Sequence, residues 1–439
     1  MDDALKIECE WWGRANGEND ISQASRGAIG ICVGDQWLTH LEDSWGNTVR
    51  NRLHASAHTL AGWLAGNWWR LRWEPETPGS RSDVDWRMSH SMASAGEGYC
   101  WPSILFASDG DTLAVASRAT RGRVLGPVRY LNEVNTRITG TAFESAIDAF
   151  LTLVLSRLHA EGFAKTELAE LWNEVMNERA DPKLAQWRRL EALCGYDPDE
   201  APAAIIEILV EDKARLGGKA LEEVAAQGRH STAKVLKPIL DLASSKVKPT
   251  RGGFRGKMPE LAVPKYEAGS RPWQRASKLA RLARKEWGLG NQALTNKHLA
   301  DLLGAKPSVF TDRAKSPMPM PILLRTGSNG SFDLYFDSSW STSRRFASGR
   351  LLGDHLHYSN SERLIPATDA RTSRQQFQRA FAQEFLCPFD ALLEKINTTQ
   401  PSDDDIAEAA AHFEVSPLMV RTTLINNGEL DRETLNWGA

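Results

Sequence analysis

Tryptophan is distributed very unevenly along this 439-residue chain, and this unevenness restricts its fold more than any other feature. Ten of the 16 tryptophans lie within the first 101 residues. Because an indole ring buries a large area, a segment so rich in it needs a substantial core. We therefore interpret these rings as core residues of an N-terminal domain. A platform that stacks bases or sugars and an exposed patch for a partner are the alternatives.

Changes in composition divide the chain into successive segments. At roughly 150 residues per domain, the length alone predicts about two to four domains. The expected fold class is α+β, with several domains and mostly helical structure. The segments are a Trp-rich α/β domain at 1–135, a helical array at 141–245, a basic linker at 246–275, a helix-turn-helix-like segment at 276–316 and a final domain at 318–439.

Charge and cysteine content exclude several classes of protein. Charged residues make up 25% of the chain and its net charge is only -3, which excludes a highly charged disordered chain and an overall basic binder. No run of 18 apolar residues occurs, so we expect no membrane-spanning helix. The acidic Asp2 and Asp3 are unlike the start of a signal peptide. The five cysteines are scattered without a Cys-x-x-Cys pair, which favours reduced thiols in the cytoplasm.

Turn signals in the first 135 residues predict two β-hairpins and one helix. We expect one hairpin at 28–38 with its turn at Gly34, and a second at 104–116 with its turn at Gly110. Residues 49–66 are expected to form a helix. In the helical array, Thr141 is a plausible N-cap, because apolar residues recur after it at helical spacing. Further helices are expected at 166–178, 182–193, 202–213, 218–226 and 232–244.

Two groups of polar side chains in the N-terminal region are candidate sites. His54 and His58 share one face of the expected helix and can hold zinc, with His90 or Glu97 as a further donor. No glutamate follows His54, so the hydrolytic motif is absent, and we interpret the pair as incidental. The second group, which we interpret as a surface turn, consists of Arg14, Asn16, Glu18 and Asp20.

The middle of the chain is strongly basic. Between Lys246 and Lys285, twelve lysines and arginines face only two acidic residues, for a local net charge of +10. The prolines and glycines of 246–275 argue against regular structure there. The near-neutral total charge therefore conceals a separation of charge that suits a polyanionic partner.

The basic region leads into a segment that resembles a bacterial repressor-type helix-turn-helix. Helices are expected at 276–287 and 296–303, and Ser308 can cap a short third helix. Ala300 is small where two helices must approach, but Pro317 soon ends the third helix, which leaves the recognition helix in doubt. A packing helix pair with a solvated basic face, or a basic surface for an acidic protein, is the alternative. The candidate DNA contacts are Arg275, Lys278, Arg281, Arg284, Lys285, Lys297, Lys306 and Arg313.

Three segments in the last third of the chain follow two expected strands, at 322–324 and 332–336, joined by a turn at 327–330. The first segment covers 344–356 and begins with Arg-Arg-Phe, the second covers 379–388, and the third covers 406–428. In this order and spacing they resemble the ImmA/IrrE family of zinc metallopeptidase-like proteins. The resemblance covers residues 318–430 and implies a zincin-like fold. Family members often carry a helix-turn-helix just upstream and commonly act in mobile-element control, toxin-antitoxin modules, phage defence and stress regulation.

The family's active helix carries a His-Glu-x-x-His motif, from which this chain departs. In that motif two histidines on one helix face ligate zinc and the glutamate activates water. The matching positions are Arg350, Leu351 and Asp354, and the third ligand position, on the next helix, is Gln375. A hydrolytic zinc site needs at least three donors, so we expect no metal, no cofactor and no catalytic residue.

A polar cluster is the expected replacement for the metal. Arg350 and Asp354 are four residues apart and can form an ion pair, to which Gln375 can hydrogen-bond. A relocated metal site is the alternative, and its donors are Asp354, His355, His357 and Glu384. The final helix pair, 405–413 and 416–426, has clear caps and offers a second place for a DNA-reading motif.

We predict a non-catalytic regulator that binds DNA or a partner protein, such as a toxin or a defence component. The antitoxin or phage-defence setting comes only from the resemblance. A zinc metallopeptidase with altered ligands is the first alternative. A protein-interaction scaffold, in which the Trp-rich domain is the sensor, is the second.

Overall fold

The computed structural model describes residues 4–13, 20–122, 126–245, 249, 252–267, 269–314, 318–326, 330–358, 362–396 and 400–431. The expected surface turn at 14–18 and most of the expected turn at 327–330 lie outside these residues. Among the described residues, no helix is both long enough and apolar enough to cross a membrane.

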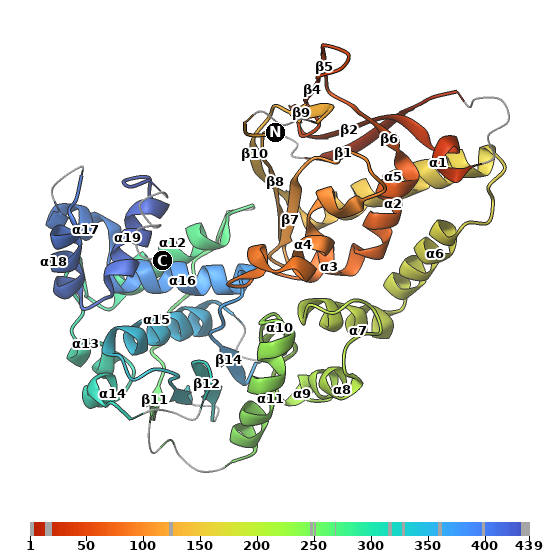
Figure 1. Cartoon of the computed structure of the whole chain (residues 1–439). Helices are drawn as coiled ribbons and strands as arrows, with labels where there is room; N and C mark the ends of the chain where they lie inside the picture. The colour runs from red at the N-terminus through yellow and green to blue at the C-terminus, as the bar shows by residue number, and fades with distance from the viewer. Residues whose placement is uncertain are drawn as a thin grey trace. The chain divides into compact units, whose positions relative to one another are not determined.

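The chain has mixed α and β structure and forms two compact units (Figure 1). The first unit comprises Met1–Glu207 with Ala370–Thr372, and the second comprises Ile208–Asp369 with Ser373–Ala439. Each unit has its own hydrophobic core. The division falls inside the segment that we expected to be a separate helical array.

The first unit combines three antiparallel sheets with helices. Its strands are β1 (Leu5–Trp11), β2 (Arg26–Val33), β3 (Gln36–Trp37), β4 (Leu41–Asp43), β5 (Thr48–Arg50), β6 (Leu53–Ser56), β7 (Ile104–Ser108), β8 (Thr112–Ser117), β9 (Val128–Tyr130) and β10 (Val134–Thr139). In the first sheet β2 pairs with β1, β3 and β6, the second has the order β10-β8-β7, and the third has the order β5-β4-β9. Both expected hairpins are confirmed, as β2–β3 and β7–β8.

The helices of the first unit cover its Trp-rich core. They are α1 (Ile21–Ala24), α2 (Ala57–Gly66), α3 (Trp68–Trp73), α4 (Val84–His90), α5 (Gly140–Ala160), α6 (Glu167–Ala180), α7 (Pro182–Leu193) and the start of α8 (Ala203–Glu211), with the 3-10 turns η1 (Ser80–Ser82) and η2 (Met92–Ala95). Phe143 and Phe150 of α5 and Trp172 of α6 belong to the same core as Trp68 and Trp69. Helices α5–α7 therefore complete the first unit, because their apolar faces cover its tryptophans.

Burial separates the tryptophans of the first 101 residues into three groups. Five are buried, namely Trp63, Trp68, Trp69, Trp86 and Trp101. Trp11, Trp37 and Trp73 are half-buried. Trp12 is 37% exposed and Trp45, between β4 and β5, is 83% exposed. The core interpretation is confirmed for the first group and wrong for Trp45.

The second unit packs helices against one four-stranded antiparallel sheet of order β11-β13-β12-β14. The strands are β11 (Gly253–Lys257), β12 (Ile322–Arg325), β13 (Ser331–Tyr335) and β14 (Leu364–Pro366). The helices are the end of α8, α9 (Lys213–Leu216), α10 (Gly218–Ala225), α11 (Arg229–Ser244), α12 (Pro272–Glu286), α13 (Asn296–Leu302), α14 (Ser308–Thr311), α15 (Ser341–His357), α16 (Ser373–Leu386), α17 (Phe389–Ile396), α18 (Asp403–Phe413) and α19 (Pro417–Asn426).

Strand β11 corrects the expectation that 246–275 lacks regular structure. Its residues pair with β13 from Gly253 opposite Tyr335 to Lys257 opposite Ser331. Gly253 and Gly256 approach neighbouring backbone so closely that an added Cβ would overlap the carbonyl oxygens of Leu334 and Leu303. The glycines that suggested a linker therefore permit a tightly packed strand.

Candidate functional site

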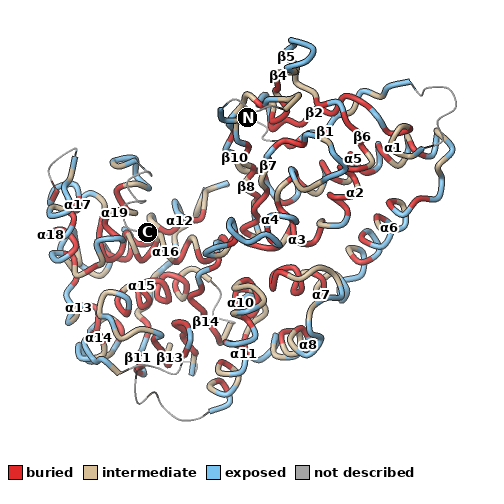
Figure 2. The backbone as a smooth tube through the Cα atoms, in the orientation of Figure 1, coloured by how far each residue is buried: buried red, intermediate tan, exposed pale blue. Residues whose placement is uncertain are grey.

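Helices α15 and α16 lie side by side (Figure 1) and carry Arg350, Asp354 and Gln375, which the family resemblance compares with zinc ligands. Both helices are buried along most of their length (Figure 2). The close approach depends on glycine, because a Cβ added at Gly353 would overlap the ring of Phe381, and one at Gly349 would lie 3.1 Å from Cβ of Ala382. Arg350 and Asp354 of α15 therefore face Gln375 and its neighbours across a narrow interface.

Asp354 forms an ion pair with Arg374 and not with Arg350, which corrects the expected pairing. Its carboxylate oxygens accept hydrogen bonds from Nε and Nη2 of Arg374 at 2.7 and 2.8 Å. Nε2 of Gln378 donates a third hydrogen bond to Oδ2 of Asp354, at 2.7 Å. Asp354 is fully buried and Arg374 is 6% exposed. The expected i,i+4 pair does not form because α16 presents a guanidinium whose fork matches the carboxylate in two bonds.

Arg350 instead forms a hydrogen bond with Gln375, and a hydrogen bond from Gln375 to the cluster was expected from the sequence. Its Nη2 donates to Oε1 of Gln375 at 2.6 Å and to the carbonyl oxygen of Thr368 at 2.5 Å. The amide nitrogen of Gln375 donates to Oε2 of Glu223 at 2.9 Å. Burial, together with the nearby cation of Arg379, lowers the pKa of Arg350 to about 9. Arg350 of α15 and Gln375 of α16 are thus joined by a direct hydrogen bond.

Two further acidic residues complete the cluster. Glu223 comes from α10 and is 8% exposed. Glu362 accepts a 2.7 Å hydrogen bond from Nη1 of Arg374 and caps α10 by accepting from the backbone N–H of Ala220 at 3.0 Å. The cluster therefore connects α10, α15, α16 and the segment around β14.

Leu351 is the residue that the family resemblance compares with the catalytic glutamate. It is fully buried in the core of the second unit, together with Phe377 and Phe381. A branched aliphatic side chain cannot accept a proton or activate water. This position therefore contributes to packing.

The donors proposed for a relocated metal site are engaged in other contacts. His355 Nδ1 lies 3.1 Å from Nη2 of Arg325, and the ring of His357 stacks on Phe377 with centroids 4.2 Å apart. Burial lowers the pKa of both histidines to about 4. Glu384 accepts a 2.7 Å hydrogen bond from Nε of Arg281. In the part of the chain that the structure describes, no three His, Cys, Asp or Glu side chains are grouped to hold a metal ion.

Arg344 and Arg345 of the Arg-Arg-Phe segment link α15 to the segments around α13 and α14. Arg344 donates to the carbonyl oxygens of Val309 and Ala314 at 2.7 and 2.5 Å, on either side of the end of α14. Arg345 donates to the carbonyl oxygen of Leu294, just before α13. Both arginines are at most 1% exposed, so their guanidinium groups satisfy loop carbonyls that burial would otherwise leave unpaired.

The histidine pair of the N-terminal region does not share a helix. His54 lies on β6 and contacts Trp12 edge to face, while His58 lies in the first turn of α2. The expected helix at 49–66 is thus wrong over its first half, where β5 and β6 form. His90 is fully buried and stacks on Trp86 with centroids 4.2 Å apart. Burial lowers the pKa of His90 to about 3.

The basic candidates on α12–α14 fall into two groups. Two of them are engaged, since Arg284 is buried and donates to three carbonyl oxygens and Arg281 pairs with Glu384, and Arg275 is half-buried. The exposed group is Lys278, Lys285, Lys297, Lys306 and Arg313. Helix α14 has only four residues, which is a single turn. The expected short third helix is confirmed, and a recognition helix of ordinary length is not formed.

Four members of the cluster, Arg374, Gln378, Glu223 and Glu362, escaped sequence reasoning. Gln378 follows Gln375 by three residues, so helical spacing was an available signal for it, whereas Arg374 is adjacent to Gln375 and this spacing does not point to it. Glu223 had no such signal, because it lies on a helix 152 residues earlier than Gln375. Comparison with protein-family models, with curated proteins and with solved structures found no match to this chain.

Proposed function

We propose that this chain is a non-catalytic regulator whose last domain is a pseudo-peptidase, and that it binds DNA through α12–α14. The observation that supports the non-catalytic part is the set of contacts made by Asp354. Its two oxygens are occupied by Arg374 and Gln378 at 2.7 to 2.8 Å. A metal ion would have to displace a buried cation from these oxygens, and Arg350 would repel it.

Metal analysis tests this part. Full-length protein is dialysed against excess zinc, then against metal-free buffer, and its zinc content and casein cleavage are measured. The expected result is far less than one equivalent of zinc and no cleavage. One tightly bound equivalent that is lost in Asp354→Asn would contradict the proposal and support the altered-ligand metallopeptidase. Circular dichroism of the variant checks that it is folded.

The DNA-binding part is supported by the exposed cations Lys278, Lys285, Lys297, Lys306 and Arg313. Lysine and arginine side chains neutralise phosphates with a strength that falls steeply as salt rises. Since α14 is one turn long, we expect contact with the DNA backbone and little base readout. The regulatory setting, as an antitoxin or a phage-defence component, rests on the family resemblance alone.

A salt series tests the DNA-binding part. Anisotropy of a labelled duplex is measured between low and physiological salt for the full chain and for Lys297→Ala/Lys306→Ala. The variant should bind more weakly, and its log-log salt slope should be smaller by about one for each phosphate that is no longer neutralised. Lys395→Ala is the matched control, because Lys395 pairs with Glu408 on α17–α18. Absence of binding at low salt would refute DNA binding and leave a protein partner as the alternative.

A further inference from the structure

Strand β1 is an edge strand with one unpaired side. It pairs with β2 from Leu5 opposite Val33 to Trp11 opposite Gly27, and β2 continues the sheet on its other side through β3 and β6. Antiparallel strands alternate between residues that exchange hydrogen bonds and residues that do not. Ala4 accepts from Gly34 and the N–H of Trp12 donates to Arg26, which places the even-numbered residues in the bonded pairs.

The main-chain groups of Leu5, Ile7 and Cys9 therefore point away from β2 and towards the open edge. Within the described residues, the backbone N–H and C=O groups of these three residues have no hydrogen-bond partner. A row of unpaired backbone groups of this kind is a template for pairing with another strand.

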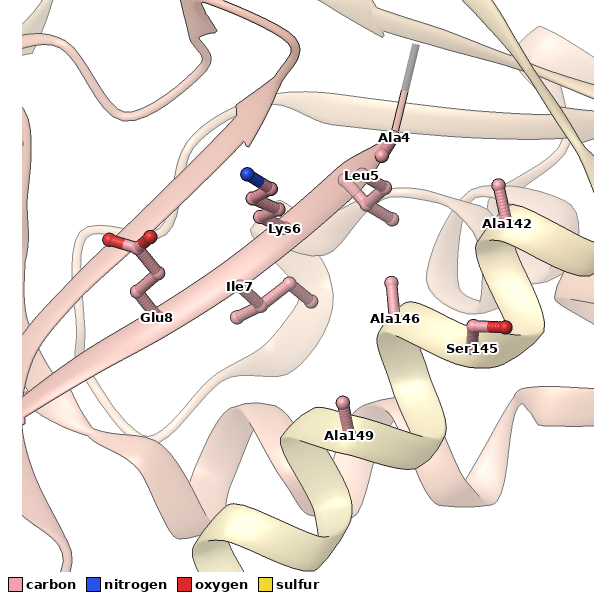
Figure 3. A pocket seen from close by; sticks show the side chains of 9 residues that line it. All are labelled: Ala4, Leu5, Lys6, Ile7, Glu8, Ala142, Ser145, Ala146 and Ala149. Atoms are coloured by element: carbon pink, nitrogen blue, oxygen red, sulfur yellow. The ribbon is translucent and has the colours of Figure 1, made fainter. Parts of the chain in front are cut away.

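A hollow of about 390 Å³ lies beside this edge (Figure 3). Leu5 and Ile7 point from β1 towards α5, whose alanines and serine form the opposite wall, whereas Lys6 and Glu8 lie on the far side of the strand. The lining residues of α5 are Ala142, Ser145, Ala146 and Ala149. Because these side chains are small, α5 leaves space beside the open edge of β1.

We propose that a second copy of this chain occupies the edge, through antiparallel pairing of β1 with β1 about a two-fold axis at Ile7. In this register Ile7 lies opposite the partner's Ile7, and Leu5 lies opposite the partner's Cys9. These three directly opposed pairs exchange about six main-chain hydrogen bonds. The side chains of Leu5 and Ile7 stay buried in the core of their own copy, so main-chain hydrogen bonds and the exposed side chains of Lys6 and Glu8 form the interface.

The charges of Lys6 and Glu8 favour a second copy of the chain as the occupant, and they favour the register with the axis at Ile7. About the axis at Ile7, Lys6 lies opposite the partner's Glu8, and Glu8 lies opposite the partner's Lys6, so each exposed pair joins opposite charges. Moving the axis to Glu8 places that carboxylate opposite its own copy, and moving it to Cys9 places Glu8 opposite the partner's Glu10. Glu8 also contacts Arg52 of its own subunit at 3.2 Å, but its side chain remains 45% exposed. The edge is thus self-complementary, as an isologous interface requires.

Sedimentation velocity of the full chain across a concentration series tests the proposal, with single charge reversals as variants. The 48.7 kDa chain should give a mass that rises towards twice this value with concentration. Lys6→Glu and Glu8→Lys should each weaken dimerisation on the order of tenfold, because both opposed pairs become like-charged. An equimolar mixture of the two variants should dimerise again, because the two introduced charges then face each other.

Hydrogen exchange gives a second, independent readout. The amides of Leu5, Ile7 and Cys9 should become protected as concentration rises, whereas those of Lys6 and Glu8, bonded to β2, should be protected throughout. A monomeric mass at every concentration, or a dimer unaffected by Lys6→Glu, would overturn the proposal. Lys6 is exposed, so its reversal leaves the fold intact and the result interpretable.

Discussion

Replacing Asp354 with alanine is expected to destabilise the second unit strongly. The substitution removes three hydrogen bonds of 2.7 to 2.8 Å and leaves the guanidinium of Arg374, 6% exposed, without its main counter-charge. Breaking a buried ion pair by removing one partner typically costs about 3–5 kcal/mol. Arg374 keeps its contact with Glu362 at 2.7 Å, so we expect the free energy of unfolding to fall by about 3 kcal/mol, at the lower end of this range.

Calorimetry is the suitable assay, because two units with separate cores can unfold in separate transitions. The matched control is Asp148→Ala, which breaks a similar two-bond pair with Arg179, at 2.7 and 3.1 Å. The Asp148 side chain is 37% exposed, so solvent screening should limit its effect on stability to less than about 1 kcal/mol.

A double variant separates the ion pair from general packing. The double variant Asp354→Leu/Arg374→Met removes both charges and fills the site with apolar side chains. The fall in its free energy of unfolding should therefore be smaller, by about 2 kcal/mol or more, than the sum of the falls caused by Asp354→Leu and Arg374→Met alone. The reasoning is refuted if Asp354→Ala costs no more than Asp148→Ala, or if the two single effects simply add.

Three further outcomes are expected. The folded-state pKa of His90 lies near 3, below the unfolded value of about 6.5, so the unfolded chain binds its proton first. The stability of the first unit should fall as pH drops from about 6.5 towards 4, and His90→Phe should reduce that slope in denaturant titrations at several pH values. Gly353→Ala should lower the melting temperature of the second unit, because a Cβ there overlaps Phe381, whereas Gly62→Ala, on α2 with nothing within 4 Å of the added Cβ, should not destabilise the first unit. Arg344→Lys should destabilise α14, since an ammonium lacks the planar fork that reaches both carbonyl groups, and faster amide exchange at 308–314 would report it.

Local patterns in the sequence predicted most helices after residue 140 correctly. Helix α7 begins at Pro182 and ends at Leu193 as expected, and Ser416 caps α19 through the N–H of Met419. Both results depend on spacing and capping chemistry, which act over a few neighbouring residues. Local reasoning failed at 49–56, where β5 pairs with the preceding strand β4 and β6 pairs with β2, farther back in the chain.

Part of the candidate site was also predictable. Helical spacing and the family resemblance led to Arg350, Asp354 and Gln375, and the expected bond between Arg350 and Gln375 is present. The choice of partner for Asp354 was not predictable, because Arg350 and Arg374 compete for one carboxylate and only the facing helix decides between them.

The sequence by itself determined which residue types stand at the motif positions that the resemblance compares, namely arginine, leucine, aspartate and glutamine at 350, 351, 354 and 375, because residue type is independent of the fold. It also determined where most helices begin and end, since these signals are local. Only the tertiary structure decided that Arg374, Gln378 and Glu223 close the cluster, and that Trp63, Trp68, Trp69 and Trp101 share one core with α5–α7. Such contacts join residues far apart in the chain, and their energies depend on burial and direction, which spacing alone does not encode.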